Sequence, residues 1–366
     1  MFAVGFLALA AAAGSGPSQP SVLKVANAMA ATVEVRVNGQ RLKLRVDPAA
    51  NGDVTLNPDA ARRSRLQPSR IPVTGLIGPV KVHGQSATSE ISMGPASARA
   101  TLIWYDQMIT QGADGVISPG LLPYDEVHLL LGPSRSDETT TAIPVHFSRD
   151  YGLAQAQSVA GNTLLVRFAV SRRDSISTAA AAAILSYQFS GSWIGEVTPF
   201  TMKLGVQRPV RALALGKAWL AGPFSITKFL VRTGDWRGDH ALPSEAQDDS
   251  GKIVVWGKTR SLQKPVYQFV VGRDHMSRCS SVIYSKAKGT LEFTCEKKQQ
   301  TFGGEPTRQS ESAKPGDLSS DCFRPVPDIL LGLADEPFGA HPHHKCDDVC
   351  AFIVQSGTRA ERTKPN

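Results

Sequence analysis

The chain contains the same order of short strands and turns twice, and this repetition limits its possible folds more than any other feature. In each copy an apolar strand ends in a polar turn, a short alanine-rich helical turn follows, and an apolar element comes late. The copies cover roughly residues 30–132 and 163–296. A unit of about 110–130 residues is too long for a solenoid repeat. The sequence therefore predicts two homologous lobes that face each other.

The first copy shows the pattern most clearly. Residues 32–37 alternate polar and apolar side chains, Asn38-Gly39 is a strong hairpin signal, and residues 42–46 alternate again. Asp47 therefore stands where a strand ends in a turn. Further elements are predicted in this copy, namely a helical turn at 58–63 and strands at 80–82, 89–93, 100–103 and 127–131.

The second copy repeats this order with changes. A strand at 164–170 leads into a polar turn at 171–177 and a helical turn at 178–184, and residues 233–252 form a polar, acidic insertion. Short strands, frequent Gly and Pro and few aromatic residues predict an all-β, bilobal fold with short helices. The predicted organisation is a signal peptide at 1–19, a first lobe at 20–132, a linker with at most one strand at 133–162, a second lobe at 163–296, and a polar linker with a Cys/His-bearing tail at 297–366.

The N-terminus and the cysteines indicate an exported protein, secreted or periplasmic. Residues 2–13 form an apolar stretch of signal-peptide length, too short to span a bilayer, although no basic residue precedes it. A buried N-terminal helix is the alternative interpretation. No other segment has the composition of a membrane span. Export makes disulfides plausible, and we expect Cys279 and Cys295, which flank a predicted hairpin, to form one.

The charge and the C-terminal tail raise two other possible functions. The formal net charge is +8, but the basic residues are scattered and accompany no nucleic-acid-binding module, so we expect no nucleic-acid partner. Residues 341–350 combine histidines with Cys346 and Cys350. Their spacing matches no zinc-finger pattern, and disulfide pairing, with Cys322 as a further candidate, is the preferred interpretation. We therefore expect neither a metal nor a cofactor.

The residues around Asp47 resemble the retropepsin-like and pepsin-like aspartic proteases. In that superfamily a strand ends in Asp-Thr-Gly or Asp-Ser-Gly, a short Ala-rich helical turn follows, and an Asp-Gly-Val-Ile-Gly phrase comes later. Here Val46-Asp47-Pro48-Ala49-Ala50 is followed by Asn57-Pro58-Asp59-Ala60-Ala61, and then by Asp114-Gly115-Val116-Ile117-Ser118 at the family's spacing. The resemblance implies a monomer of two β-rich lobes whose cleft holds an extended peptide or protein ligand.

The resemblance also implies two carboxylates that share a proton and activate a water. Asp47 is the first, and Asp174 is the candidate for the second, with Ser171 as the alternative occupant of that position. Asp114 and Asp274 are interpreted as structural. Pro48 and Ala49 depart from the family pattern, because they remove a hydroxyl that ties the two turns and a glycine at their close approach.

Two functions follow and remain open at this point. One is an aspartic endopeptidase that uses Asp47 and Asp174. The other is a catalytically degenerate scaffold that binds extended peptides or a protein partner in the cell envelope. A half-site enzyme, in which two chains each contribute Asp47, is a weaker third possibility.

Overall fold

The structure is a computed structural model that describes residues 21–26, 31–94, 96–236, 238, 240–243 and 265–297. Strands make up 55% of the described residues and helices 11%, which confirms the predicted all-β class. The strands form three sheets. No helix within the described ranges is long and apolar enough to cross a membrane. The proposed signal peptide, Cys322, Cys346, Cys350 and the tail histidines lie outside the described residues.

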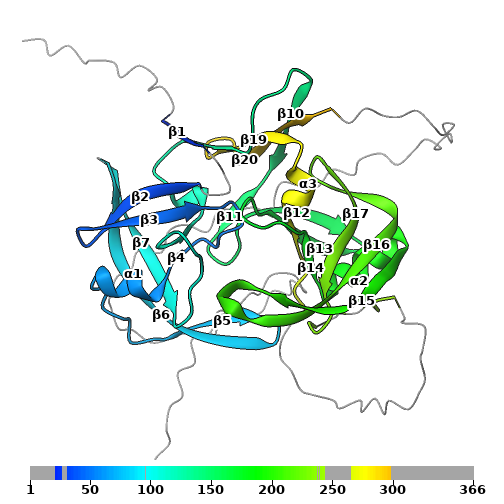
Figure 1. Cartoon of the computed structure of the whole chain (residues 1–366), viewed down its shortest axis with the longest axis horizontal. Coiled ribbons are helices and arrows are strands. Elements are labelled where there is room, and N and C mark those ends of the chain that lie inside the picture. Colours follow the sequence, from blue (N-terminus) through cyan, green and yellow to red (C-terminus); the bar gives the residue numbers. More distant parts are fainter. Residues whose placement is uncertain are drawn as a thin grey trace, which may run out of the picture. The chain divides into compact units, whose positions relative to one another are not determined.

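The first sheet has seven strands in the order β2-β3-β8-β4-β7-β6-β5 (Figure 1, blue to cyan). Its strands are β2 (Thr32–Val37), β3 (Gln40–Val46), β4 (Val54–Leu56), β5 (Val73–Ile77), β6 (Val80–Met93), β7 (Ala96–Tyr105) and β8 (Gly115–Ile117). The helix α1 (Pro58–Arg63) lies between β4 and β5 in the chain. Asn38 and Gly39 form the predicted β2–β3 turn, and both have positive φ (49° and 78°). This conformation is what a two-residue hairpin turn requires, and Asn and Gly tolerate it best.

The second sheet has eight strands in the order β11-β12-β13-β18-β14-β17-β16-β15 (Figure 1, green to yellow). Its elements are β11 (His146–Ser148), β12 (Gly152–Val159), β13 (Asn162–Phe168), β14 (Ile176–Thr178), β15 (Gly191–Thr201), β16 (Gln207–Ala221), β17 (Phe224–Arg232), β18 (Gln268–Val271) and the helix α2 (Ala179–Phe189). Thr178 caps α2 by accepting a hydrogen bond from Ala181 N at 3.2 Å. The small alanines are fully buried where α2 packs against β15 and β16.

The two larger sheets share one strand arrangement. In each, the strand that precedes the polar turn pairs in parallel with a late strand: β3 with β8, and β13 with β18. The late strand is antiparallel to its next neighbour, β4 or β14, which is in turn parallel to β7 or β17. Apart from the additional edge strand β11, the order of the eight-stranded sheet follows that of the seven-stranded sheet strand by strand.

The third sheet combines strands from distant parts of the chain. It has the order β1-β9-β19-β20-β10 and contains β1 (Val22–Val25), β9 (Glu126–Leu130), β10 (Glu138–Pro144), β19 (Cys279–Ser285) and β20 (Thr290–Glu296). The predicted disulfide is confirmed: Cys279 and Cys295 lie opposite each other in the β19–β20 pair and are bonded. Phe293 of this sheet packs on Phe168 of β13, with ring centroids 4.9 Å apart, so the core is continuous between sheets.

The segment at 133–162 differs from the expected linker with at most one strand. It contains β10, β11 and β12, of which β10 extends the third sheet and the other two extend the second. Residues 138–141 read Glu-Thr-Thr-Thr, whose β-branched side chains favour a strand but show little apolar alternation. Pairing with β20 therefore determines the structure of β10 more than the pattern of its own residues does.

Candidate functional site

Asp47 lies immediately after β3, in a turn that its own side chain stabilises. Its backbone N–H donates to Ile117 O at 3.1 Å, and its Oδ1 accepts from Ala49 N at 2.9 Å. Ala50 N donates to Asp47 O at 2.9 Å, which closes the turn. Pro48 fits because its fixed φ suits a turn position and no partner for a backbone N–H is needed there. The Asp47 residue is only 5% exposed.

The turn that follows β13 contacts the Asp47 turn directly. Ser171 Oγ donates a hydrogen bond to Asp47 Oδ2, although the two residues are 124 positions apart. Arg167 of β13 also contacts the Asp47 turn: its Nη2 donates to Ala49 O and, at 3.1 Å, to Asn51 Oδ1. The Asp47 carboxylate is thus held from both halves of the repeat, by a main-chain N–H on one side and a serine hydroxyl on the other.

Backbone hydrogen bonds identify the second-copy residue that corresponds to Asp47. Asp47 N binds the carbonyl of Ile117, the last residue of β8, and Ala169 N binds the carbonyl of Val271, the last residue of β18, at 2.9 Å. Ala169 therefore occupies the equivalent position, and it is buried at 3% exposure. No carboxylate stands there, and Ser171 reaches Asp47 from two residues further along the turn.

Asp174 lies three residues beyond Ser171 and is half-buried. Its carboxylate is not a hydrogen-bond partner of Asp47 in the described part of the chain, where the Asp47 side chain bonds Ala49 N and Ser171 Oγ. Its main chain is packed tightly, because a Cβ on Gly272 would stand 2.7 Å from Asp174 O. Arg172 interacts electrostatically with both Asp47 and Asp174. The structure thus brings Asp47 and Ser171 into direct contact. Asp174 is related to Asp47 only indirectly, because the Arg172 guanidinium interacts electrostatically with both carboxylates.

Three cationic side chains interact electrostatically with Asp47. Burial lowers the pKa of the Arg167 guanidinium to about 10, and the charge of Asp47 opposes this change. Burial also lowers the pKa of Arg172, again against the attraction of Asp47 and Asp174. Lys203 is an exposed residue, but lost hydration of its ammonium group lowers its pKa to about 8, with the charge of Arg167 acting in the same direction.

Lys203 reaches the site from the β15–β16 hairpin. It begins the short 3₁₀ helix η2 (Lys203–Gly205) at the hairpin end, which Met202 N closes by donating to Val206 O at 2.8 Å. Phe200 of β15 lies beside Arg172, with the guanidinium carbon 5.7 Å from the ring centroid. The hairpin end therefore lies close to the two turns and adds a cation to them.

The three cations are functional residues that the sequence did not predict. A detectable signal existed for Arg167, which is the one charged residue in the apolar run Leu164-Leu165-Val166-Arg167-Phe168-Ala169-Val170. A buried charge in such a strand needs a partner, so its presence indicates a polar contact across the core. Arg172 and Lys203 stand in polar turns, where basic residues are ordinary, and no local pattern distinguishes them.

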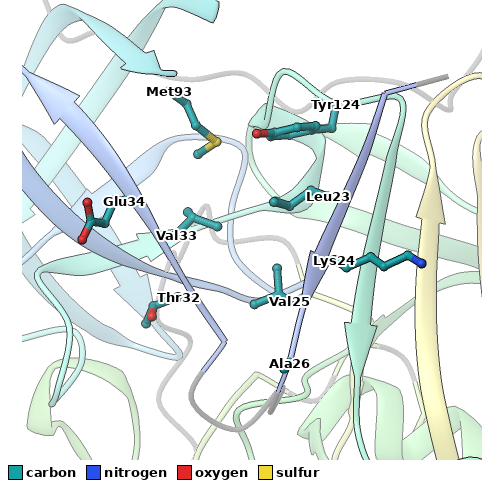
Figure 2. A pocket seen from close by; sticks show the side chains of 9 residues that line it. All are labelled: Leu23, Lys24, Val25, Ala26, Thr32, Val33, Glu34, Met93 and Tyr124. Carbon is teal, nitrogen blue, oxygen red and sulfur yellow. The ribbon is translucent and has the colours of Figure 1, made fainter. Parts of the chain in front are cut away.

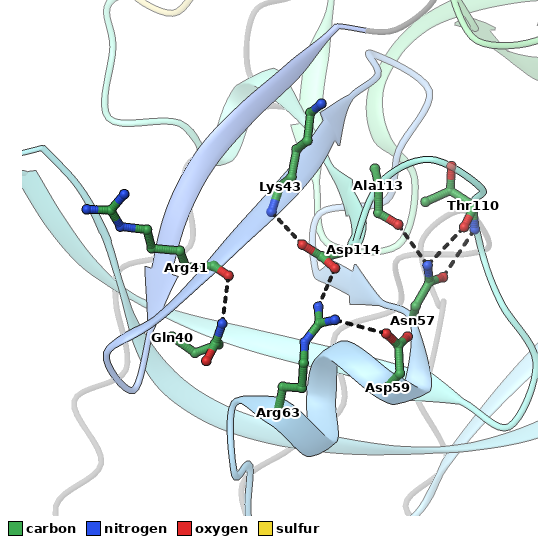
Figure 3. A network of polar contacts seen from close by, with 9 residues as sticks. All are labelled: Gln40, Arg41, Lys43, Asn57, Asp59, Arg63, Thr110, Ala113 and Asp114. Carbon is green, nitrogen blue, oxygen red and sulfur yellow. Dashed lines mark hydrogen bonds and ion pairs between the residues drawn. The ribbon is translucent and has the colours of Figure 1, made fainter.

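Asp274 and Asp114 have the structural roles that we expected. Asp274 accepts from Ser175 N at 3.0 Å and from Ser175 Oγ at 2.7 Å. It lies in the first turn of the helix α3 (Arg273–Met276), next to His275, whose Nδ1 lies 2.9 Å from Ser175 Oγ. Asp114 accepts from Lys43 N at 2.7 Å and pairs with Arg63 of α1 (Figure 3). Both carboxylates therefore fix the loops next to the Asp47 and Ser171 turns and do not belong to the site.

An open cavity of about 410 Å³ lies elsewhere, between β1 and β2. Figure 2 shows Leu23, Val25, Val33, Met93 and Tyr124 around it. Its lining includes neither Asp47 nor any residue of the Ser171 turn. The described ranges also contain no group of three or more His, Cys, Asp or Glu side chains that could hold a metal ion.

The site therefore consists of one buried carboxylate, one serine hydroxyl and three cations at the contact between two turns. With this geometry established, comparisons with known proteins add no relative: no protein-family model matches the chain, and no curated protein sequence matches it significantly.

Proposed function

We propose that this chain is an exported, catalytically silent aspartic-protease-like protein that binds extended peptides or a protein partner. The observation that carries the proposal is the replacement of the second carboxylate: Ala169 stands at the position equivalent to Asp47, and Asp47 is hydrogen-bonded by Ser171. Peptide hydrolysis in this superfamily needs two carboxylates that share one proton. A single carboxylate that a hydroxyl holds and that three cations attract is poorly suited to that chemistry.

The common strand order of the two larger sheets supports the protease-like, bilobal part of the proposal. Each half carries its polar turn at the same point, and the two turns touch. In this arrangement a peptide would lie along the line between the halves, where β-strand addition and side-chain pockets provide affinity. The Cys279–Cys295 disulfide supports export, because such bonds persist in oxidising compartments.

The test combines hydrolysis and binding on the same preparation. Labelled casein is incubated with the protein from pH 3 to pH 8, alongside Asp47→Asn and the control Asp59→Asn, which changes an exposed carboxylate on α1. We expect no turnover by any of the three proteins. We also expect the wild type to bind extended peptides in fluorescence anisotropy.

Turnover that a general aspartic-protease inhibitor blocks, and that Asp47→Asn alone abolishes, would overturn the proposal. That result would support the enzymatic alternative, in which Asp47 and Asp174 act together. One observation favours this alternative: Arg172 interacts with both carboxylates and could bring them into one electrostatic system. Loss of turnover in Asp174→Asn as well would complete the case for it.

A further inference from the structure

We propose that the contact between the two turns is an anion site, which binds a carboxylate of the peptide ligand through Arg172 and Lys203. This inference rests on the proposed function and specifies the ligand: a peptide that carries a free C-terminal carboxylate or an acidic side chain at this point. Such a preference is the opposite of what a pair of acidic residues would give. It follows from the charges, from the unused donors and from the position of the hairpin end.

Cations outnumber carboxylates at the site. Arg167, Arg172 and Lys203 interact electrostatically with Asp47, and the carboxylate of Asp174 acts on Arg172. Arg172 also disfavours the charge of Arg167, and both arginines disfavour the charge of Lys203. An uncompensated positive charge in partly buried surroundings is unfavourable, and a bound anion would relieve it.

Two of the three cations have side-chain N–H donors that no described residue accepts from. Arg167 is committed to Ala49 O and Asn51 Oδ1. The side chains of Arg172 and Lys203, by contrast, make no hydrogen bond or ion pair with any residue that the structure describes. The Arg172 guanidinium lies over the Phe200 ring. That contact leaves N–H donors for a ligand, and a guanidinium fork matches a carboxylate in two-point geometry.

Lys203 makes binding at the site depend on pH, because its ammonium group loses its proton above a pKa of about 8. It stands at the end of the β15–β16 hairpin, while Arg167 and Arg172 belong to β13 and the turn that follows it. A ligand carboxylate between the hairpin and the turns would contact Arg172 and Lys203 from different elements. Because the pKa of Lys203 is about 8, its contribution to binding would be present at pH 7 and lost by about pH 9.5.

The test uses one extended heptapeptide of alternating valine and threonine, labelled with fluorescein at its N-terminus. Three forms are compared by anisotropy with the full chain: an amidated C-terminus, a free C-terminal carboxylate, and an amidated form with one central threonine replaced by aspartate. We expect at least one carboxylate form to bind about tenfold tighter than the neutral amide at pH 7. The form that gains affinity distinguishes a terminal from a side-chain carboxylate.

The variants Arg172→Gln and Lys203→Gln should reduce this preference to about twofold or less, as expected when one donor of a charge-assisted pair is lost. Lys228→Gln, which removes an exposed cation on β17, should leave it unchanged. Equal affinity for all three peptides would overturn the anion site and leave the proposed function intact. Failure to bind any of the three peptides would overturn both the anion site and the peptide-binding part of the proposed function. Circular dichroism of each variant verifies that it is folded.

Discussion

At the scale of single residues, the Asp47 turn depends on close approaches that only glycine permits. Gly152, which begins β12, has φ +65°, and a Cβ built on it would stand 1.8 Å from Ala50 O. A Cβ built on Gly52 would likewise stand 2.4 Å from Ser148 O. Glycines on both sides of this contact therefore let the β11–β12 hairpin pack against the Asp47 turn.

Gly152→Ala should destabilise the protein by about 3 kcal/mol or more, because backbone must move away from the new methyl group. The matched control is Gly161→Ala: Gly161 has φ +75°, but a Cβ added to it would meet no atom within 4 Å, so only the backbone strain of about 1–2 kcal/mol is expected. Urea unfolding of both variants measures the difference. Equal losses would show that the contact with Ala50 is unimportant.

Asn57 is a second residue whose role local sequence cannot reveal. It is 3% exposed, and its amide makes four hydrogen bonds. Nδ2 donates to Thr110 O and Ala113 O, and Oδ1 accepts from Thr110 N (Figure 3). Oδ1 also accepts from Ile109 N. Asn57→Ala should cost about 2–3 kcal/mol, since buried main-chain groups lose their partners. Gln40→Ala removes the solvent-facing bond to Arg41 O and should cost less than about 0.5 kcal/mol in the same unfolding assay.

At the scale of elements, patterns that repeat over several residues were readable and contacts between distant elements were not. The Asn38-Gly39 hairpin, the helix at Pro58–Arg63 and the Cys279–Cys295 bridge all follow from local chemistry, and the structure confirms them. For the site, the sequence predicts Asp47 and Asp174 as the pair of carboxylates, with Ser171 as the alternative occupant of the second position. The Asp47–Ser171 hydrogen bond, the equivalence of Ala169 and the position of Lys203 depend on tertiary packing, which no local pattern encodes.

The β19–β20 hairpin should depend measurably on its disulfide. The bridge closes a loop with a sequence separation of 16, and β20 also carries β10 at the sheet edge. The variant with Cys279→Ala and Cys295→Ala should lose about 2–3 kcal/mol of unfolding free energy, because the unfolded chain regains the entropy of that loop. Hydrogen exchange should increase first in β10 and β20. Unchanged stability would contradict this role of the bridge.

The helix α3 and the Ser171 turn should weaken together in acid. The carboxylate of Asp274 is partly desolvated, which raises its pKa, but hydrogen bonds from His275 and Ser175 outweigh this and leave the pKa below its ordinary value of 3.8. A depressed carboxyl pKa gives stability that is present above pH 3.8 and is lost as the pH falls below it. Asp274→Asn should therefore be less stable than wild type at about pH 6, and the difference in unfolding free energy should narrow towards about pH 2.

At the scale of the whole described molecule, the two halves of the repeat share a sheet and a core. β9 of the first half pairs with β19 of the second, and Phe168 packs on Phe293 across sheets. The end of the β5–β6 hairpin also abuts the other half, because a Cβ on Gly78 would stand 2.1 Å from Asp235 Oδ1. Asp235 is itself fixed by Arg208 Nη2 at 3.1 Å and Arg232 Nε at 2.7 Å.

These connections predict one cooperative unfolding transition for both halves, although many chains of this length unfold in steps. Calorimetry should give a single peak whose calorimetric and van't Hoff enthalpies agree. Leu129→Ala is the informative variant, since Leu129 is 1% exposed on β9 opposite Val282 of β19. A cavity there should cost about 2–5 kcal/mol and lower the midpoint of the whole transition. Two resolved peaks, only one of which moves in Leu129→Ala, would mean that each half is stable by itself and that the Asp47–Ser171 contact forms between independently folded units.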